Sequence, residues 1–597
     1  MRRLIPRRPR TFANERVSEI HDIAVPAIES APVTLTTPIT SPDEHAAPLD
    51  LLLTNSTRGI AGRMLPRGPL TRLGVSLAKQ PRTLAGRGSL LARELGAIAT
   101  GKSARVPAKS DKRFADPAWH ANPLLKRTMQ AYLAAADTAD AVFTDADLDW
   151  RDSEKVRFAL DNLIEGLAPT NNPLLSPLGW KALIDTGGLS AIRGVKAFAH
   201  DMASHPRVPA MVDPDAFAVG ETVATTKGAV VLQTRAFELI HYAPQTPAVH
   251  AVPLLVVPPV INKYYIVDIA PGRSMIEHFL QQGQQVFAIS WRNPQARHRD
   301  WGFDTYGAAI IEALDAVQTI AGTDSAHLLA TCSGGILAAM VAAHLTDIGE
   351  GERIASLALA VTVLDQTNAG FAAAAMSDRA AQAAIRTSAA KGYLDGRTLA
   401  ELFAWLRPTD LVWRYWVNNY VQGRSPAAFD VLFWNSDTTR MAAALHKDMV
   451  LLGTGNKLTT PGAVTMLGTP VDLSTVTADS YIVSGIADHI SPWQACYRSA
   501  QMFGGKDNRF VLSTNGHIAA LVNPPGNPRA SFRAGRVDES SADEWFESSE
   551  KTSDSWWSDY TGWLANRSGP QIEAPHTLGG RDLPPLAPAP GTYVHHN

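Results

Sequence analysis

The sequence predicts an α/β fold in which helices cover both faces of a mainly parallel sheet. Short, continuously apolar segments recur along residues 226–597, and such segments are typical of strands buried on both faces. Helix-like segments separate several of them, which favours parallel neighbours because a parallel connection must cross over the sheet. One apolar segment, within residues 326–345, runs directly into a turn of small residues and then a helix.

The composition agrees with a folded protein and excludes several classes of function. The 597 residues are 45% hydrophobic and 19% charged, unlike a disordered or collagen-like chain. This length predicts two to four domains of about 100–200 residues each. With 55 basic and 57 acidic side chains, the net charge of −2 gives no electrostatic basis for nucleic-acid binding. Two cysteines cannot build a disulfide framework, so we expect a reducing compartment and any functional cysteine to act as a thiol.

The first 225 residues divide into a tail and a helical domain. Residues 1–57 predict a disordered or weakly ordered tail; five of the first ten residues are arginine, and no apolar signal-peptide segment follows. Residues 58–225 predict a helical N-terminal domain. Its first part, 58–102, has nine basic residues, one acidic residue and many leucines. That pattern fits a segment for an apolar or anionic surface, and equally a pair of basic helices docked on the body.

Residues 226–597 predict the α/β domain. We expect helices at 274–282 and 334–345, and core positions for Trp556, Trp557 and Trp563. Between about 363 and 477 the alternation stops, and an insertion of this length predicts a cap over the site. The stretch 325–346 has no formal charge, but its central Cys-Ser-Gly-Gly favours a strand, turn and helix, and we expect no membrane span. The predicted strands are 229–233, 237–242, 253–257, 285–289, 326–330, 357–361, 481–484 and 510–512.

The turn after the strand at 326–330 predicts a catalytic nucleophile at Cys332. A strand, a turn of small residues and a helix form the layout of a nucleophile elbow, in which the turn exposes one side chain above the sheet. A thiol at a helix N-terminus is favoured as thiolate, and the amide of Ser333 would stabilise an oxyanion. Ala330 stands where this turn usually has glycine. A buried structural cysteine is the competing interpretation of Cys332.

An acid and a base follow in the order that the α/β-hydrolase fold requires. Asp488 lies on the loop after the strand 481–484, and His517 lies on the loop after the strand 510–512. Both positions lie outside the carboxyl ends of parallel strands, where such sheets gather active-site residues. His489 shares the loop of the acid, so we assign it a supporting role. Cys496 lies in a predicted helix and is expected to serve packing.

With these residues in place, the chain resembles the polyhydroxyalkanoate synthases, the bacterial polyester polymerases. The resemblance runs from about residue 60 to the C-terminus, and Cys332, Asp488 and His517 match the nucleophile, acid and base of the family. The Cys-Ser-Gly-Gly turn and the sequences at 392–396 and 523–528 are most similar to the medium-chain, class II branch of single-subunit enzymes. The departures are Ala330 and a longer N-terminal tail. Further matching segments are 113–119, 258–265, 290–294, 406–413, 433–435, 516–518 and 523–525.

The resemblance implies an acyltransferase that polymerises (R)-3-hydroxyacyl-CoA into polyester and releases CoA, through a covalent acyl-thioester on Cys332. The oxyanion hole would use the amide of Ser333 and one near Val260 and Ile261. No metal or other cofactor is implied. The resemblance also implies a homodimer at the surface of cytoplasmic polymer inclusions, in the company of granule-coat proteins. It leaves the preferred monomer length and the CoA-binding residues open.

Two other functions stay open at this point. A thioesterase or polyester depolymerase would use the same scaffold and would release a free acid. A non-catalytic granule-associated protein would keep the elbow only as part of the fold, and the basic segment 58–102 would suit that role. An acyl-CoA assay separates the three, because they predict insoluble polymer, soluble acid and no reaction.

Overall fold

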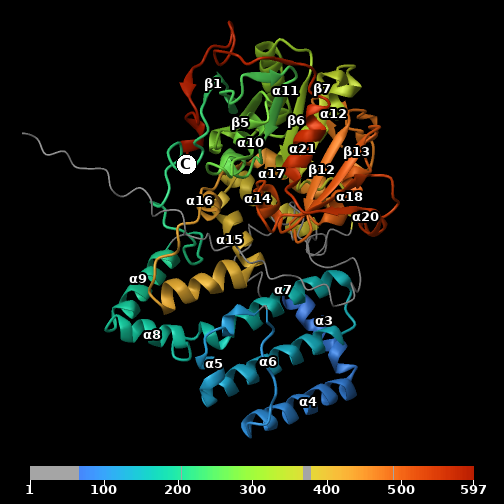
Figure 1. Cartoon of the computed structure of the whole chain (residues 1–597). Helices are drawn as coiled ribbons and strands as arrows, with labels where there is room; N and C mark the ends of the chain where they lie inside the picture. The colour runs from blue at the N-terminus through green and yellow to red at the C-terminus, as the bar shows by residue number, and fades with distance from the viewer. Residues whose placement is uncertain (1–65, 110, 204, 368–377, 489) are drawn as a thin grey trace, which may run out of the picture.

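The computed structural model describes residues 66–597 except 110, 204, 368–377 and 489 (Figure 1). The predicted N-terminal tail at 1–57 lies outside the described residues. Helices of the N-terminal part form one layer of the molecule, and the sheet with its covering helices forms the other. Helix α15 (Gly396–Leu406) lies between the two parts.

The long secondary-structure elements of the N-terminal part are all helices within its described residues. Asn122 caps α6, because its side chain accepts hydrogen bonds from the amides of Leu124 and Leu125. Helices α3 and α4 are the two basic helices that one interpretation of 58–102 expects. They pack against α7 and α6, and Arg87 on α4 contacts Asp145 at 2.7 Å. The helices are α3 (Arg67–Ala78), α4 (Pro81–Ala99), α5 (Ala118–Ala121), α6 (Pro123–Thr144), α7 (Trp150–Gly166), α8 (Pro177–Asp185) and α9 (Leu189–Ala203).

A sheet of eleven strands, counted over the described residues, organises the second part, and its six central strands are parallel. In spatial order these are β13 (Asn508–Ser513), β12 (Ser480–Gly485), β7 (Ile354–Ala360), β6 (Ala326–Thr331), β4 (Leu254–Val257) and β5 (Val286–Trp291). Antiparallel strands flank them: β14 (Phe532–Arg536) and β15 (Glu550–Thr552) on one side, β2 (Phe237–Tyr242), β1 (Gly228–Gln233) and β17 (Ala587–Pro588) on the other. Each of the eight predicted strands overlaps a strand of the structure; β14, β15 and β17 were not predicted.

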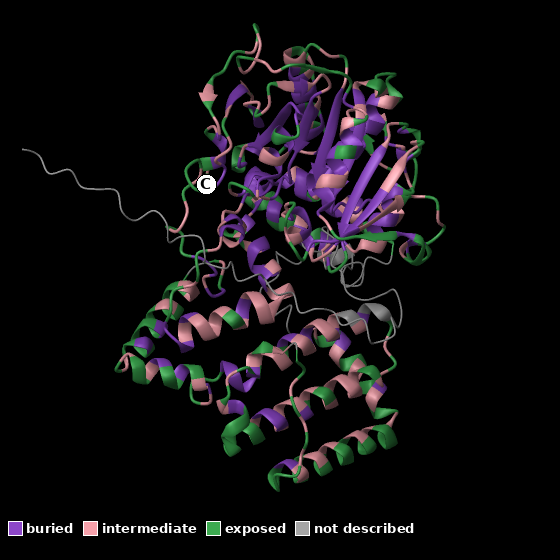
Figure 2. Cartoon of the chain, in the orientation of Figure 1, coloured by how far each residue is buried: buried purple, intermediate pink, exposed green. Residues whose placement is uncertain are grey.

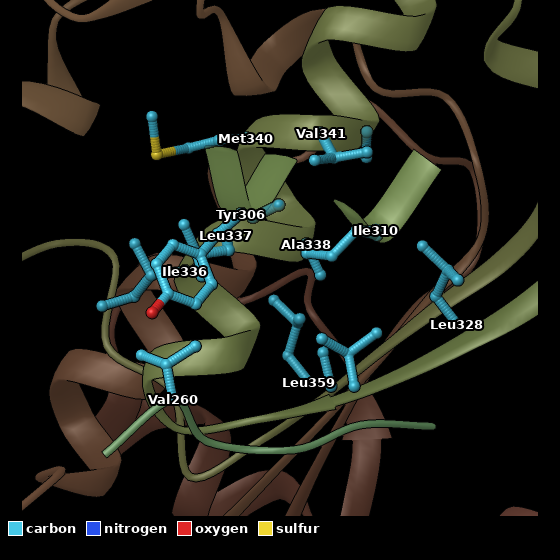
Figure 3. Close-up of a cluster of buried hydrophobic side chains, with 14 of the residues drawn as sticks. Val260, Tyr306, Ile310, Leu328, Ile336, Leu337, Ala338, Met340, Val341 and Leu359 are labelled. Carbon is cyan, nitrogen blue, oxygen red and sulfur yellow. The ribbon is translucent and has the colours of Figure 1, made fainter. Parts of the chain in front are cut away.

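Alternating strand residues build two cores, one on each face of the sheet. In β4, Leu255 and Val257 face the first core, whereas Leu254 and Val256 face the second. Figure 2 shows the central strands of the sheet as buried. The first core contains α11 (Phe303–Ala321), α12 (Ser333–Asp347) and α18 (Trp493–Ala500), and Figure 3 shows how α12 packs into it. The second contains α10 (Met275–Gln281), α19 (His517–Leu521) and α21 (Trp556–Ala565). The prediction that the three tryptophans of α21 are core residues is confirmed.

The segment between β7 and β12 interrupts the alternation and packs against the N-terminal helices. Gly194 of α9 lies against the insertion so closely that a Cβ there would be 2.0 Å from the carbonyl oxygen of Tyr420. Asn419 donates to the carbonyl oxygen of Ala210 at 2.7 Å. No helix within the described ranges is long and apolar enough to cross a membrane. Besides α15, the insertion contains α14 (Asp378–Lys391), β8 (Tyr393–Leu394), the π-helical turns η6 (Thr409–Trp413) and η7 (Trp416–Val421), α16 (Asp430–Ser436), β9 (Met441–Ala442) and α17 (Ala443–Thr454).

The remaining short elements are four strands and one helix. They are β3 (Ala248–His250), β10 (Thr465–Met466), β11 (Thr469–Pro470), α20 (Ala542–Ser548) and β16 (Gln571–Glu573). Short 3-10 turns connect several of the main elements. They are η1 (Lys112–Phe114), η2 (Pro169–Asn171), η3 (Tyr264–Asp268), η4 (Ala296–His298), η5 (Gly351–Arg353), η8 (Lys457–Thr459), η9 (Leu473–Thr475) and η10 (Tyr593–His595).

Candidate active site

Cys332 is the single residue between β6 and α12, and its backbone conformation is strained. Its φ of 50° and ψ of −121° lie in a region that L-residues rarely adopt, at a typical cost of about 1–3 kcal/mol. Its neighbours fix this conformation: the amide of Cys332 donates to the carbonyl oxygen of Ala360 at 2.9 Å, and Gly335 donates to the carbonyl oxygen of Cys332 at 3.0 Å. The side chain is half-buried. The backbone therefore holds the thiol above the edge of the sheet, as an elbow requires.

The two glycines after the turn let α12 approach the neighbouring loops. A Cβ on Gly334 would lie 2.4 Å from the carbonyl oxygen of Pro258, and one on Gly335 would lie 2.1 Å from Oγ1 of Thr362. Ala330 is different, because it belongs to β6, pairs with Val257 and is fully buried in the first core. Its methyl group therefore points into the core of the protein. The positions where α12 comes close to neighbouring loops are Gly334 and Gly335.

Asp488 and His517 form a buried hydrogen-bonded pair. Nδ1 of His517 lies 2.7 Å from Oδ2 of Asp488. The other carboxylate oxygen, Oδ1, accepts hydrogen bonds from the amides of Ile490 and Ser491 at 2.8 and 2.9 Å. His517 begins α19, after the short loop that follows β13, and Asp488 lies on the loop that follows β12. The two predicted residues are thus brought together at the carboxyl ends of adjacent parallel strands, while His489 lies outside the described residues.

The surroundings of His517 favour the imidazolium form. Burial alone lowers the pKa of this histidine, but the charge of Asp488 and hydrogen bonds with Asp488 and Cys332 outweigh that effect and raise the pKa to about 10. Since Nδ1 of His517 is hydrogen-bonded to Asp488, Nε2 of the same ring is the nitrogen that makes the hydrogen bond with Cys332. The arrangement therefore joins thiol, imidazole and carboxylate in one chain of hydrogen bonds, which can carry a proton away from the thiol.

The loop after β4 lies against the first turn of α12. The amide of Val260 donates to Oγ of Ser333 at 3.1 Å, so this predicted oxyanion donor already has a partner inside the protein. Ser333 opens α12, and the first amides of a helix have no partner within the helix. The amide of Ile261 makes no hydrogen bond within the part of the chain that the structure describes. Within the described residues, the amides of Ser333 and Ile261 therefore have no hydrogen-bond partner in the protein.

The thiol opens on a small, largely apolar cavity. Ser491 is one of its polar lining residues, and its hydroxyl donates to the carbonyl oxygen of Val361 at 2.9 Å. Cys496 lies fully buried near the site; burial raises the pKa of its thiol, as expected for the packing role predicted for it. In the described ranges, no group of three His, Cys, Asp or Glu side chains could hold a metal ion. The cavity is lined by Cys332, Ile336, Val361, Val363, Gln366, Ile490 and Ser491.

Two family models match the chain. One, described as the N-terminus of poly-beta-hydroxybutyrate polymerase (PhaC), matches residues 110–279, and one for the alpha/beta hydrolase fold matches residues 264–524. The second match covers all three candidate residues of the proton-transfer chain. The fold that the elbow predicts is therefore confirmed.

Characterised relatives match over most of the chain. Poly(3-hydroxyalkanoate) polymerase 1 of Ectopseudomonas oleovorans is 44% identical over 502 residues, which cover 84% of this chain and 89% of the relative. Poly(3-hydroxyalkanoate) polymerase 2 of the same organism is 41% identical and covers 90% of this chain and 96% of the relative. The poly(3-hydroxyalkanoate) polymerase subunit PhaC of Cupriavidus necator is 37% identical, with 83% and 85% covered.

Proposed function

Since this chain belongs to the poly(3-hydroxyalkanoate) polymerases and is therefore an acyltransferase that synthesises polyester, we propose that Cys332, His517 and Asp488 carry the reaction. The substrate is (R)-3-hydroxyacyl-CoA and the products are lengthened polyester and free CoA. The observation that carries this assignment is the buried contact of 2.7 Å between His517 and Asp488, next to the strained Cys332.

The first step is acyl transfer to the enzyme. Nε2 of His517 takes the proton of the Cys332 thiol, and the sulfur attacks the thioester carbonyl of the acyl-CoA. Asp488 holds the ring through Nδ1 and stabilises the imidazolium that forms. The amides of Ser333 and Ile261 bind the oxyanion of the tetrahedral intermediate. As this intermediate collapses, the bond to the CoA sulfur breaks, and His517 returns the proton to that leaving group.

The second step lengthens the chain. The 3-hydroxyl group at the end of one acyl chain gives its proton to His517 and attacks the acyl group bound to Cys332. A new ester bond forms, the thioester bond to Cys332 breaks, and the thiolate recovers a proton from His517. A cysteine suits both steps, because exchange between two thioesters is nearly isoenergetic and leaves the acyl group activated. A serine would store the same group as a less reactive oxyester.

Water has to be kept from the acyl-enzyme, because hydrolysis would end the polymer. The cavity beside Cys332 is lined mainly by apolar side chains, and we assign the acyl chain to it. The insertion between β7 and β12 serves as the cap that limits access of water. The identities of 44% and 41% to the two Ectopseudomonas polymerases, against 37% to the Cupriavidus subunit, support the resemblance to the medium-chain branch.

The test is CoA release from 3-hydroxybutyryl-CoA and 3-hydroxydecanoyl-CoA by the wild type, Cys332→Ala and the control Cys496→Ala. We expect CoA and insoluble product from the wild type and the control, and neither from Cys332→Ala. The faster substrate then assigns the chain-length class. CoA release with only soluble acid would instead indicate a thioesterase or depolymerase, and full activity of Cys332→Ala would refute the assignment of the nucleophile.

We extend the proposal to assembly and location. The enzyme works as a homodimer at the surface of cytoplasmic polymer inclusions, where granule-coat proteins are its neighbours. Analytical ultracentrifugation with and without substrate tests the dimer, and fractionation of polymer-producing cells tests the location.

A further inference from the structure

Lys263 is a buried cation at the end of the loop that follows β4. Only 4% of the residue is exposed, and burial lowers the pKa of its ammonium group while the charge of Asp437 opposes that shift. Its Nζ donates to the carbonyl oxygen of His596 at 2.6 Å. Over the residues that the structure describes, Nζ has no carboxylate within 4.0 Å. The direct partner of this buried cation is therefore a neutral backbone group.

The loop 258–263 is fixed at two ends. At its start, Val260 donates to Ser333 Oγ at 3.1 Å, and Nε1 of Trp291 donates to the carbonyl oxygen of Pro258 at 3.0 Å. At its far end, the carbonyl oxygen of Lys263 accepts a hydrogen bond from Nε1 of Trp434 on α16 at 2.7 Å. The amide of Ile261 lies between these two ends.

The C-terminal segment, residues 592–596, is itself anchored to the sheet (Figure 1). The carboxylate of Glu238 on β2 accepts hydrogen bonds from the amides of Thr592 and Tyr593, both at 2.9 Å. Asn293 also donates to the carbonyl oxygen of His596, at 3.1 Å, and its own side-chain oxygen accepts from the amide of Arg440. The end of the chain, the loop after β4 and the insertion thus meet at one point.

We infer that Lys263 is a positioning residue: by binding the carbonyl oxygen of His596, it fixes the far end of the loop 258–263 and so aims the Ile261 amide at the oxyanion formed on Cys332. The C-terminal segment thereby becomes part of the apparatus that supports acyl transfer. This inference rests on the proposed function. It assigns a role in acyl transfer to residues that contact neither the substrate nor the thiol.

The chemistry of the contact argues for positioning over simple packing. Burying an ammonium group is costly, and a neutral carbonyl offsets less of that cost than a carboxylate would. For packing alone, a methionine of similar length would serve as well or better. A hydrogen-bond donor at position 263 is needed only if the contact must fix the backbone of both the loop 258–263 and the C-terminal segment.

The experiment compares the full-length enzyme with Lys263→Met, a truncation that lacks residues 593–597, both changes together, and Lys506→Met as an exposed control. Two rates are measured for each protein. Single-turnover release of CoA from 3-hydroxydecanoyl-CoA depends on the oxyanion donors. Alkylation of Cys332 by iodoacetamide depends on the thiol and His517 but forms no oxyanion.

We expect Lys263→Met and the truncation each to lower the rate of CoA release about tenfold or more, because displaced oxyanion donors cost at least that much. Their alkylation rates should stay within about twofold of the wild type. The double change should be no worse than the more severe single change, since the contact between Lys263 and His596 is lost in each case. The control should match the wild type in both rates.

Unchanged CoA release in Lys263→Met would overturn the inference. So would a parallel fall of alkylation and CoA release, because that result indicates general damage to the site. Failure of the proposed function would appear separately, as a wild type that releases no CoA.

Discussion

Replacing Asp488 with asparagine tests the proton-transfer chain at its buried end. The new side chain has nearly the same shape, and its oxygen can keep the two hydrogen bonds from Ile490 and Ser491. Its NH₂ group then faces Nδ1 of His517, where the carboxylate oxygen lies at 2.7 Å in the wild type. To accept from this donor, the ring must carry its proton on Nε2, the nitrogen that should receive the proton of Cys332. The variant therefore holds His517 in the wrong tautomer.

The size of the effect follows from the pKa of His517. Its value of about 10, against an ordinary value of about 6.5, corresponds to about 5 kcal/mol in favour of the imidazolium. Burial opposes this shift, whereas Asp488 and, to a smaller extent, Cys332 produce it. If the loss of the carboxylate removes about 4 kcal/mol of this stabilisation from the transition state, the rate falls about 10³-fold.

Single-turnover release of CoA, measured from pH 6 to 9, is the appropriate assay for Asp488→Asn. The alkylation of Cys332 by iodoacetamide should slow as well, because the thiolate loses its imidazolium partner. Asp472→Asn serves as the control, since it removes an equivalent charge at the cap of a short turn outside the site. A rate loss smaller than about tenfold, in a variant that remains folded, would refute the proposed role of Asp488.

Four further outcomes follow from the geometry. The raised pKa of His517 means that stabilisation by this group is complete below about pH 6.5 and is lost as the pH rises toward about 10, so urea unfolding should show a declining stability over that range. Ala330→Gly should cost about 0.5–1 kcal/mol in urea unfolding and leave CoA release nearly unchanged, since this methyl group is buried in the core of the sheet. Gly334→Ala should lower CoA release about 10²-fold, because its Cβ would displace the loop at Pro258. Iodoacetamide should label one thiol in the native protein and two after denaturation, counted by mass spectrometry, because Cys496 is fully buried.

The centre of the fold could be predicted because burial on both faces leaves a plain pattern in the sequence. Every residue of β4, β5 and β6 is buried. β4 is a continuous apolar run, and the apolar residues of β5 and β6 are interrupted only by Ser290, His327 and Thr331. The edge strands lack this pattern. β15 is exposed along its whole length, β14 is mostly half-buried, and β17 has two residues. Their pairing depends on the neighbours that the fold supplies, which local sequence does not reveal.

The chemical centre could be predicted for a related reason. Cys332, Asp488 and His517 each follow a strand that is itself recognisable, and parallel strands end at the same edge of the sheet. The oxyanion donors could be placed only approximately. Whether Val260 or Ile261 has a free amide depends on the hydroxyl of Ser333, which lies 73 residues away along the chain.

The contact of Lys263 with His596 shows where inference from one sequence ends. The two residues are 333 positions apart, and the acceptor is a backbone carbonyl. Every residue has such a carbonyl, so the residue type at position 596 does not predict the contact. A lysine in a loop is ordinarily exposed, so its identity alone predicts solvent contact. Buried, and paired with a backbone oxygen, it can only be understood from the three segments that meet around it. Mutation of Lys263 is informative for the same reason. General damage to the site would lower both CoA release and alkylation of Cys332, whereas a misplaced loop would lower CoA release alone.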